Sequence, residues 1–190
     1  MQNKDFFLKR ALDSIEQQTF KDYEIVITEE GKMAENTNAA IKKAKGEIIK
    51  ILYMDDYLAH PNALENMAQS FRGGWLATGC AHDNGKELFN IHYPEWNSSE
   101  EMMKGVNTIG SPSVIMLEND DPLLFDENLS WLLDCELYKR LFERYGKPII
   151  LNDIGVIMGV GEHQMTNLLT DEEKLSEHKY LNEKTITDRD

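Results

Sequence analysis

The sequence predicts a single α/β domain in which helices flank a mostly parallel sheet. Helical and strand-like patterns alternate over the first 72 residues, and this alternation is typical of parallel strands joined by crossover helices. The strand-like runs are short and rich in isoleucine and valine, as expected for strands buried on both faces. A length of 190 residues is enough for one domain with a hydrophobic core and does not require a second.

The N-terminal half contains the clearest alternation. Helices are predicted over 6–18, over 34–45 and from Pro61 onward, and strands over 23–28 and 47–53. The first helix has apolar residues at every third or fourth position and Asp5 as a plausible N-cap. Gly46 provides a C-cap for the second helix, and a proline in the first turn favours the start of the third.

The C-terminal half is less regular. Strands are predicted over 75–81, 114–117, 149–151 and 154–160, a loop-rich stretch over 82–108, and a helix over 129–145. The acidic run that begins at Thr170 opens a charged terminal helix or tail, which we expect to be a solvated surface element. We therefore expect one domain over 1–170, followed by this charged segment over 171–190.

Charge and composition restrict the partners. The chain has 34 acidic and 20 basic residues and a formal net charge of −14, which disfavours nucleic acid as a partner. An acidic protein can still bind a nucleotide if a divalent cation bridges the two negative partners. The two cysteines, Cys80 and Cys135, lie in unrelated contexts, and no apolar run approaches the ~20 residues that span a bilayer. These features predict a cytoplasmic protein without a transmembrane segment.

Asp55 and Asp56 are the most informative residues. An apolar strand-like stretch ends abruptly at these two adjacent carboxylates. Paired acids at the C-terminal end of a strand are suited to holding a divalent cation against phosphate oxygens. Adjacent like charges are also costly unless a cation or hydrogen-bond donors neutralise them. Taken alone, such a pair is more often a solvated turn after a strand, so the metal site depends on the surrounding sequence.

Four segments of the chain resemble family 2 glycosyltransferases of the GT-A fold, a Rossmann-like architecture. Enzymes of this family read S-I-x-x-Q-T after the first helix, then a strand, an acidic turn, A-K-G-E, a second strand and D-x-D-D. The matching segments are 7–15, 18–27, 44–49 and 55–58. The resemblance covers residues 3 to 165 and implies a nucleotide and metal half over 1–110 and an acceptor half over 111–170.

The resemblance also implies roles for individual residues. Glu29 and Glu30 occupy the turn whose acids contact the base or ribose, although the family usually has aspartates there. Asp55 and Asp56 would bind the nucleotide sugar through a Mn²⁺ or Mg²⁺ ion that bridges the diphosphate. Asp134 matches the general base of inverting members.

The implied activity is metal-dependent transfer of a sugar from a nucleotide-diphosphate donor to a hydroxyl of a carbohydrate or other acceptor. His163 lies where the family often has a segment that covers the diphosphate, so it is a third candidate metal ligand. For Asp134, the simpler alternative is a first-turn acid that interacts with the helix dipole.

Three departures from the family pattern favour an alternative function. Tyr53 stands where the first acid of D-x-D-D is usual, and Leu133 replaces the acid that precedes the general base. The family also begins with a strand that ends at the position of Asn3, so this sequence starts where that strand has already finished. A truncated sequence, a degenerate protein and a variant sheet all explain this, and each predicts an exposed strand edge and weakened nucleotide binding. The alternative is an inactive sugar- or nucleotide-binding module.

Overall fold

The structure is a computed structural model that describes residues 4–161 and 168–187. Its helices are α1 (Lys4–Glu16), α2 (Met33–Lys43), α3 (Ala63–Ser70), α4 (Ser99–Met103), α5 (Leu133–Tyr145) and α7 (Asp171–Thr187). Its strands are β1 (Ile48–Lys50), β2 (Tyr57–Leu58), β3 (Trp75–Asp83), β4 (Leu88–His92), β5 (Ile115–Glu118) and β6 (Ile149–Gly159). The predicted α/β class is confirmed.

The sheet is mixed rather than mostly parallel, which corrects the sequence prediction. The described strands follow the order β1-β5-β3-β6-β2, and β4 pairs with β3 outside this path. Among these pairs β3 and β6 run parallel, while the other pairs are antiparallel. Most antiparallel pairs involve β5, which lies between β1 and β3, and β2, which pairs with β6. Two further features contribute to the difference. A short turn joins β3 to β4 as a hairpin, and the segment 23–28, which was expected to be a parallel strand, does not join the sheet.

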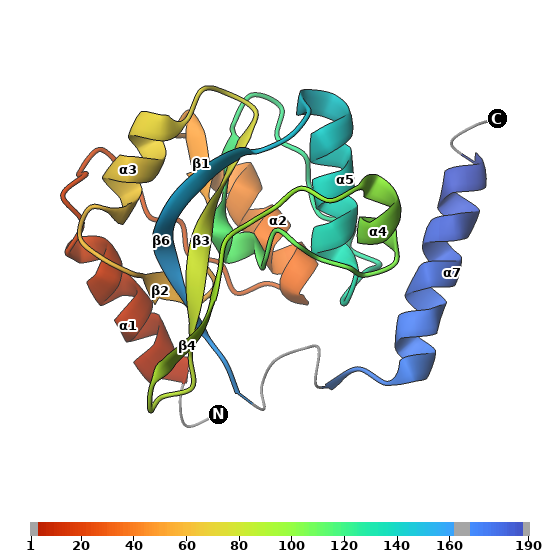
Figure 1. Cartoon of the computed structure of the whole chain (residues 1–190), viewed down its shortest axis with the longest axis horizontal. Helices are drawn as coiled ribbons and strands as arrows, with labels where there is room; N and C mark the ends of the chain where they lie inside the picture. The colour runs from red at the N-terminus through yellow and green to blue at the C-terminus, as the bar shows by residue number, and fades with distance from the viewer. Residues whose placement is uncertain (1–3, 162–167, 188–190) are drawn as a thin grey trace.

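Helices cover both faces of the sheet. In Figure 1, α1 and α3 lie on one side, and α2, α4 and α5 lie on the other. The core between these layers is built around Trp75 and Leu76 of β3, Ile115 of β5, and Leu137 and Tyr138 of α5, all fully buried. Trp75 stacks on Tyr138 with ring centroids 5.6 Å apart, so the central strand and α5 share one aromatic contact.

Several elements differ in length from the prediction. The two strands expected over 149–160 are one strand, β6, whose register against β3 shifts around Gly79. The helix expected over 129–145 starts at Leu133, because the preceding residues form the loop that leads into it. The loop-rich stretch contains β4 and the short helix α4. No helix within the described ranges is both long enough and apolar enough to cross a membrane.

The C-terminal helix α7 is docked rather than merely solvated. Figure 1 shows it beside α5, on the far side from the sheet. Glu177 accepts hydrogen bonds from the backbone N–H groups of Ser130, Trp131 and Leu132, at 2.8 to 3.1 Å. Lys184 forms an ion pair with Asp126 at 2.7 Å. The charged terminal segment is therefore anchored next to the N-terminus of α5.

Candidate functional site

A groove of about 1170 Å³ opens at the edge of the sheet. Two backbone segments form its sides: residues 23–30, and β1 with its continuation to Asp56. Residues of α1 and α2, among them Leu8, Ile15 and Ile41, close its faces. We call this space the edge groove. It also reaches Asp134 at the start of α5, so it connects both halves of the chain.

Asp55 lies in the loop after β1 and lines the edge groove. Its backbone is tightly constrained: the Asp55 carbonyl accepts a hydrogen bond from Arg10 Nη2 at 2.5 Å. Arg10 in turn forms an ion pair with Asp83 at 2.8 Å and lies over the ring of Tyr57 at 4.3 Å. A Cβ atom on Gly159 would lie 2.2 Å from the same carbonyl, so this close approach requires glycine. Residues from α1, β3 and β6 therefore fix this loop.

Asp56 is directed into the protein, unlike its neighbour. Its residue is 3% exposed, and its Oδ1 accepts the backbone N–H of Gly159 at 2.9 Å. Burial raises the pKa of Asp56 to about 7, and the charge of Asp55 acts in the same direction. Hydrogen bonds from Ser113 and Gly159 favour the ionised form and limit the increase. These contacts make Asp56 a support of the loop that carries Asp55.

Asp134 is the second residue of α5. Its Oδ2 accepts a hydrogen bond from Asn107 Nδ2 at 2.7 Å, and its Oδ1 accepts the backbone N–H of Cys135 at 2.7 Å. Burial raises the pKa of Asp134 to about 6, against the opposing effect of these two donors. A carboxylate with a pKa of about 6 is largely ionised at neutral pH and is a stronger base than an ordinary aspartate.

Tyr53 lies between the two candidate carboxylates. Its hydroxyl is shielded from solvent, and burial raises its pKa, with further increases from the charges of Asp134, Asp56 and Asp55. The Tyr53 hydroxyl is therefore close enough to be affected by the carboxylates of both the β1 loop and α5. Asp55 and Asp134 belong to segments far apart in the sequence, and the fold brings them to the same groove.

Comparisons with known proteins agree with this architecture. Crystal structures of S. aureus TarS superpose on the chain. The structure of TarS 1–349 in complex with UDP-GlcNAc matches at a TM-score of 0.69 and 17% identity, covering 94% of this chain and 62% of that one. The same region of TarS in complex with UDP matches at a TM-score of 0.60 and 16% identity, covering 84% of this chain and 58% of that one. The fold is GT-A-like.

The likeness is one of fold. At these identities it carries no assignment of family or substrate, and the chain spans about three fifths of the TarS region that it matches. No protein-family model matches the sequence. No curated protein matches it either.

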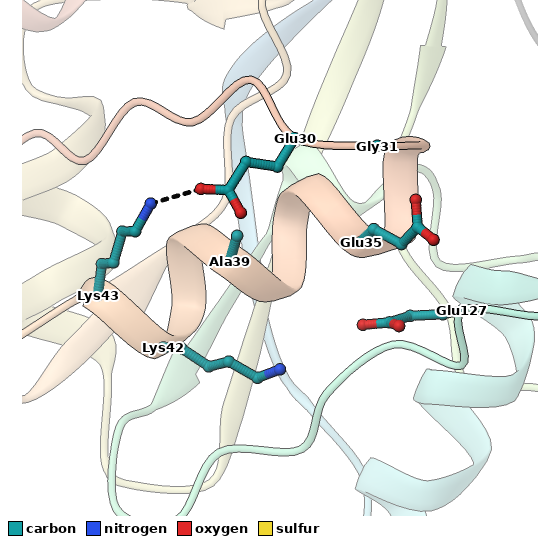
Figure 2. A pocket seen from close by; sticks show the side chains of 7 residues that line it. All are labelled: Glu30, Gly31, Glu35, Ala39, Lys42, Lys43 and Glu127. Carbon is teal, nitrogen blue, oxygen red and sulfur yellow. Dashed lines mark hydrogen bonds and ion pairs between the residues drawn. The ribbon is translucent and has the colours of Figure 1, made fainter.

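Glu29 and Glu30 lie at the end of the groove wall that residues 23–30 form. Both are engaged in ion pairs, Glu29 with Lys4 and Glu30 with Lys43 at 2.6 Å. Figure 2 shows Glu30 turned toward Lys43 across a hollow of about 480 Å³ beside α2. In this arrangement Glu30 extends along the helix.

The remaining candidate metal ligand, His163, lies outside the described residues. Within the described ranges, no group of three or more His, Cys, Asp or Glu side chains is arranged to hold a metal ion. Of the carboxylates expected to hold Mn²⁺ or Mg²⁺, Asp55 and Asp56 are described and both line the groove, but Asp56 is 3% exposed and hydrogen-bonded to Gly159. A hard divalent cation can be held by one protein carboxylate when substrate phosphates and water supply the other oxygens.

Sequence reasoning missed three residues of this site. Arg10 holds the Asp55 carbonyl, Asn107 holds the Asp134 carboxylate, and Lys50 donates to the carbonyls of Ile51 and Ser113 beneath the groove. Burial lowers the pKa of Lys50 to about 7, while the charge of Asp56 opposes this decrease. Only Lys50 had a visible signal, as a charged residue within an apolar strand; Arg10 and Asn107 lie in ordinary sequence contexts.

Proposed function

We propose that this protein is a glycosyltransferase that moves a sugar from a nucleotide-diphosphate donor to an acceptor hydroxyl. One observation carries the proposal: Asp55 and Asp134 line one groove of a GT-A-like fold. The TarS structures with UDP-GlcNAc and with UDP support a nucleotide-sugar donor, because they have the same fold with such ligands bound. The acceptor and the sugar stay open.

Asp134 would act as the general base. As the acceptor oxygen forms its bond to C1 of the sugar, the Asp134 carboxylate would take the proton of that hydroxyl. The bond between C1 and the diphosphate oxygen breaks, and its electron pair leaves with the diphosphate. Attack from the side opposite the leaving group gives inversion at C1. Asn107 would keep the carboxylate oriented through its 2.7 Å hydrogen bond.

Asp55 would hold a Mn²⁺ or Mg²⁺ ion beside the diphosphate. Such a cation neutralises negative charge on the leaving phosphates. Asp56 would support it indirectly, by fixing the loop through Gly159. Glu29 and Glu30 would approach the nucleoside after Lys4 and Lys43 release them. His163 stays a further candidate ligand.

Donor turnover tests the proposal. We expect release of nucleoside diphosphate from at least one member of a nucleotide-sugar panel, dependent on Mn²⁺ or Mg²⁺ and abolished by EDTA. Asp55→Ala should reduce this turnover at least ~100-fold, because a cation bound through one carboxylate is lost with it. Asp120→Ala is the matched control, since Asp120 is an exposed acid outside the groove. Equal loss in both variants, or turnover that persists in EDTA, would contradict the assignment.

A second candidate function is a binding module without turnover. It is favoured by Tyr53, which fills the place of an acid next to Asp55, and by the inward direction of Asp56. Isothermal titration with UDP and a UDP-sugar distinguishes the two. A module binds without requiring metal and releases no product over hours, whereas the enzyme consumes the donor.

A further inference from the structure

Arg10 joins α1 to the loop that carries Asp55. Its Nη2 donates to the Asp55 carbonyl at 2.5 Å, and its Nη1 donates to the Asp83 carboxylate at 2.8 Å. Two nitrogens of one planar guanidinium therefore hold the loop after β1 and the end of β3 at a fixed spacing. A lysine ammonium lacks this fork, so the arrangement depends on arginine.

Asp83 and Tyr57 orient the guanidinium in turn. The side chains of Arg10 and Asp83 are 22% and 14% exposed, so solvent screens their ion pair only in part. Tyr57 Oη donates to the same Asp83 oxygen at 3.0 Å, and the Tyr57 ring centroid lies 4.3 Å from Arg10 Cζ. Asp83 Oδ1 also accepts the backbone N–H of Gly85 at 2.7 Å. These contacts orient Arg10 independently of any ligand.

The end of β6 closes the same junction. A Cβ atom on Gly159 would collide with the Asp55 carbonyl and would lie 3.0 Å from Arg10 Nη2, so glycine leaves the room that this hydrogen bond needs. The next residue, Val160, donates its N–H to the Asp83 carbonyl at 2.9 Å. The Asp55 carbonyl is therefore enclosed by α1, β3 and β6.

Fixing the Asp55 carbonyl has a consequence for the Asp55 carboxylate. Both groups belong to one residue, so a fixed backbone restricts the directions in which the side chain can project into the edge groove. Groups that orient a metal ligand without touching the metal typically change metal affinity by about 10- to 100-fold. The positive charge of Arg10 acts the other way, because it repels a cation, but the negative charge of Asp83 compensates it.

We propose that Arg10, oriented by Asp83, is a positioning residue for cation binding at Asp55. The inference rests on the proposed function, in which Asp55 holds a Mn²⁺ or Mg²⁺ ion. Arg10 does not line the edge groove, so it acts through the Asp55 carbonyl rather than by touching the donor. Loss of this contact weakens cation binding, whereas loss of a nearby positive charge by itself would strengthen it.

A charge-neutral double substitution separates positioning from electrostatics. Arg10→Met combined with Asp83→Asn removes one positive and one negative charge, so no charged side chain is left without its partner. The matched control is Lys9→Met combined with Asp13→Asn, an exposed ion pair of 2.5 Å on the same helix. Electron paramagnetic resonance measures Mn²⁺ binding in the presence of UDP. We expect the affinity to fall at least ~10-fold in the first variant and to stay within ~2-fold in the control.

Amide exchange without metal or nucleotide gives a second readout. Hydrogen–deuterium exchange over 54–57 should accelerate at least ~10-fold in the first variant and not in the control, because the loop loses its attachment to α1. Arg10→Lys keeps the charge but loses the fork, so it should weaken Mn²⁺ binding by at least ~3-fold. Circular dichroism and urea titration establish that all three variants fold.

The outcomes distinguish this inference from the proposed function. Mn²⁺ affinity at or above the wild-type value in either Arg10 variant, or unchanged exchange over 54–57 in the double variant, would overturn the inference and leave the proposed function standing. Absence of Mn²⁺ binding by the wild-type protein would overturn the proposed function, and the inference with it.

Discussion

Asp134 combines a buried carboxylate with two hydrogen-bond donors, and burial raises its pKa to about 6. A general base must be ionised, so turnover should fall as pH decreases through about 6 and reach a plateau above about 7. Initial rates of donor consumption between pH 4.5 and 8.5 measure this dependence. A profile that falls only below about pH 4, as for an ordinary aspartate, would remove Asp134 from the role of base.

Asp134 also predicts the direction in which the free energy of unfolding changes with pH. Because the folded-state pKa lies above 3.8, the ordinary value for an aspartate, the stabilisation from protonated Asp134 is full below about 4 and is lost as pH rises through about 6. Asp134→Asn should therefore abolish turnover yet raise the free energy of unfolding at pH 8 by about 1 to 3 kcal/mol, with no gain at pH 4. Urea denaturation at the two pH values provides the measurement, with Asp120→Asn as control. Lower stability of Asp134→Asn at pH 8 would show that the carboxylate is structural.

For single residues, the sequence identifies candidate acids more readily than the residues that form hydrogen bonds with them. Asp55 and Asp56 were identifiable because a strand ended at them, but nothing separated their roles. The structure does so, since Gly159 and Ser113 turn Asp56 inward. Asn107 reaches Asp134 across 27 positions of sequence, and such a contact depends on how the loop before β5 folds.

Among the elements, α1 is attached to the sheet by two residues of the S-I-x-x-Q-T motif. Ser14 Oγ accepts the N–H of Leu58 at 3.0 Å, while Gln18, 2% exposed, donates to the His60 carbonyl and accepts the N–H of Leu64. In this chain the motif therefore joins α1 to β2 and α3. Its role is structural, which the motif alone did not indicate.

Removing the Gln18 side chain should destabilise this junction. Gln18→Ala leaves the Leu64 N–H and the His60 carbonyl without their partner, and we expect a loss of about 2 to 3 kcal/mol in the free energy of unfolding. Gln17→Ala, at an exposed neighbour, should change it by less than about 0.5 kcal/mol. Urea titrations followed by circular dichroism compare the two, and equal stabilities would contradict the assigned contact.

The helix α7 is the second element whose attachment to the protein the amino-acid composition did not predict. Asp126 is buried, which opposes ionisation, but hydrogen bonds from Lys184, Asn128 and Tyr180 hold its pKa at about 2. The charged helix was expected to be solvated because acidic and basic residues dominate its sequence. Its attachment combines the polar contacts of Glu177 and Lys184 with burial of Leu181, which is 5% exposed and joins the hydrophobic core.

Glu177 allows this attachment to be tested. Glu177→Ala would leave three backbone N–H groups of the loop before α5 without their acceptor, so we expect a loss of about 2 kcal/mol in stability. Hydrogen–deuterium exchange should accelerate both in α7 and over 130–132. Glu172→Ala, an exposed acid on the first turn of the same helix, serves as the control. Unchanged exchange over 130–132 would show that the carboxylate does not cap this loop.

For the whole molecule, local patterns predicted most elements but not how they pair. Periodicity located α1, α2 and α5, because each packs one side against the core, whereas β3 was predicted from a short apolar run whose residues 75–81 are all buried. Strand direction depends on neighbours distant in sequence, and the run 23–28 has strand composition without a neighbour to pair with. Its exposed isoleucines and the unpaired edge of β1 are two consequences of one cause, the gap between them.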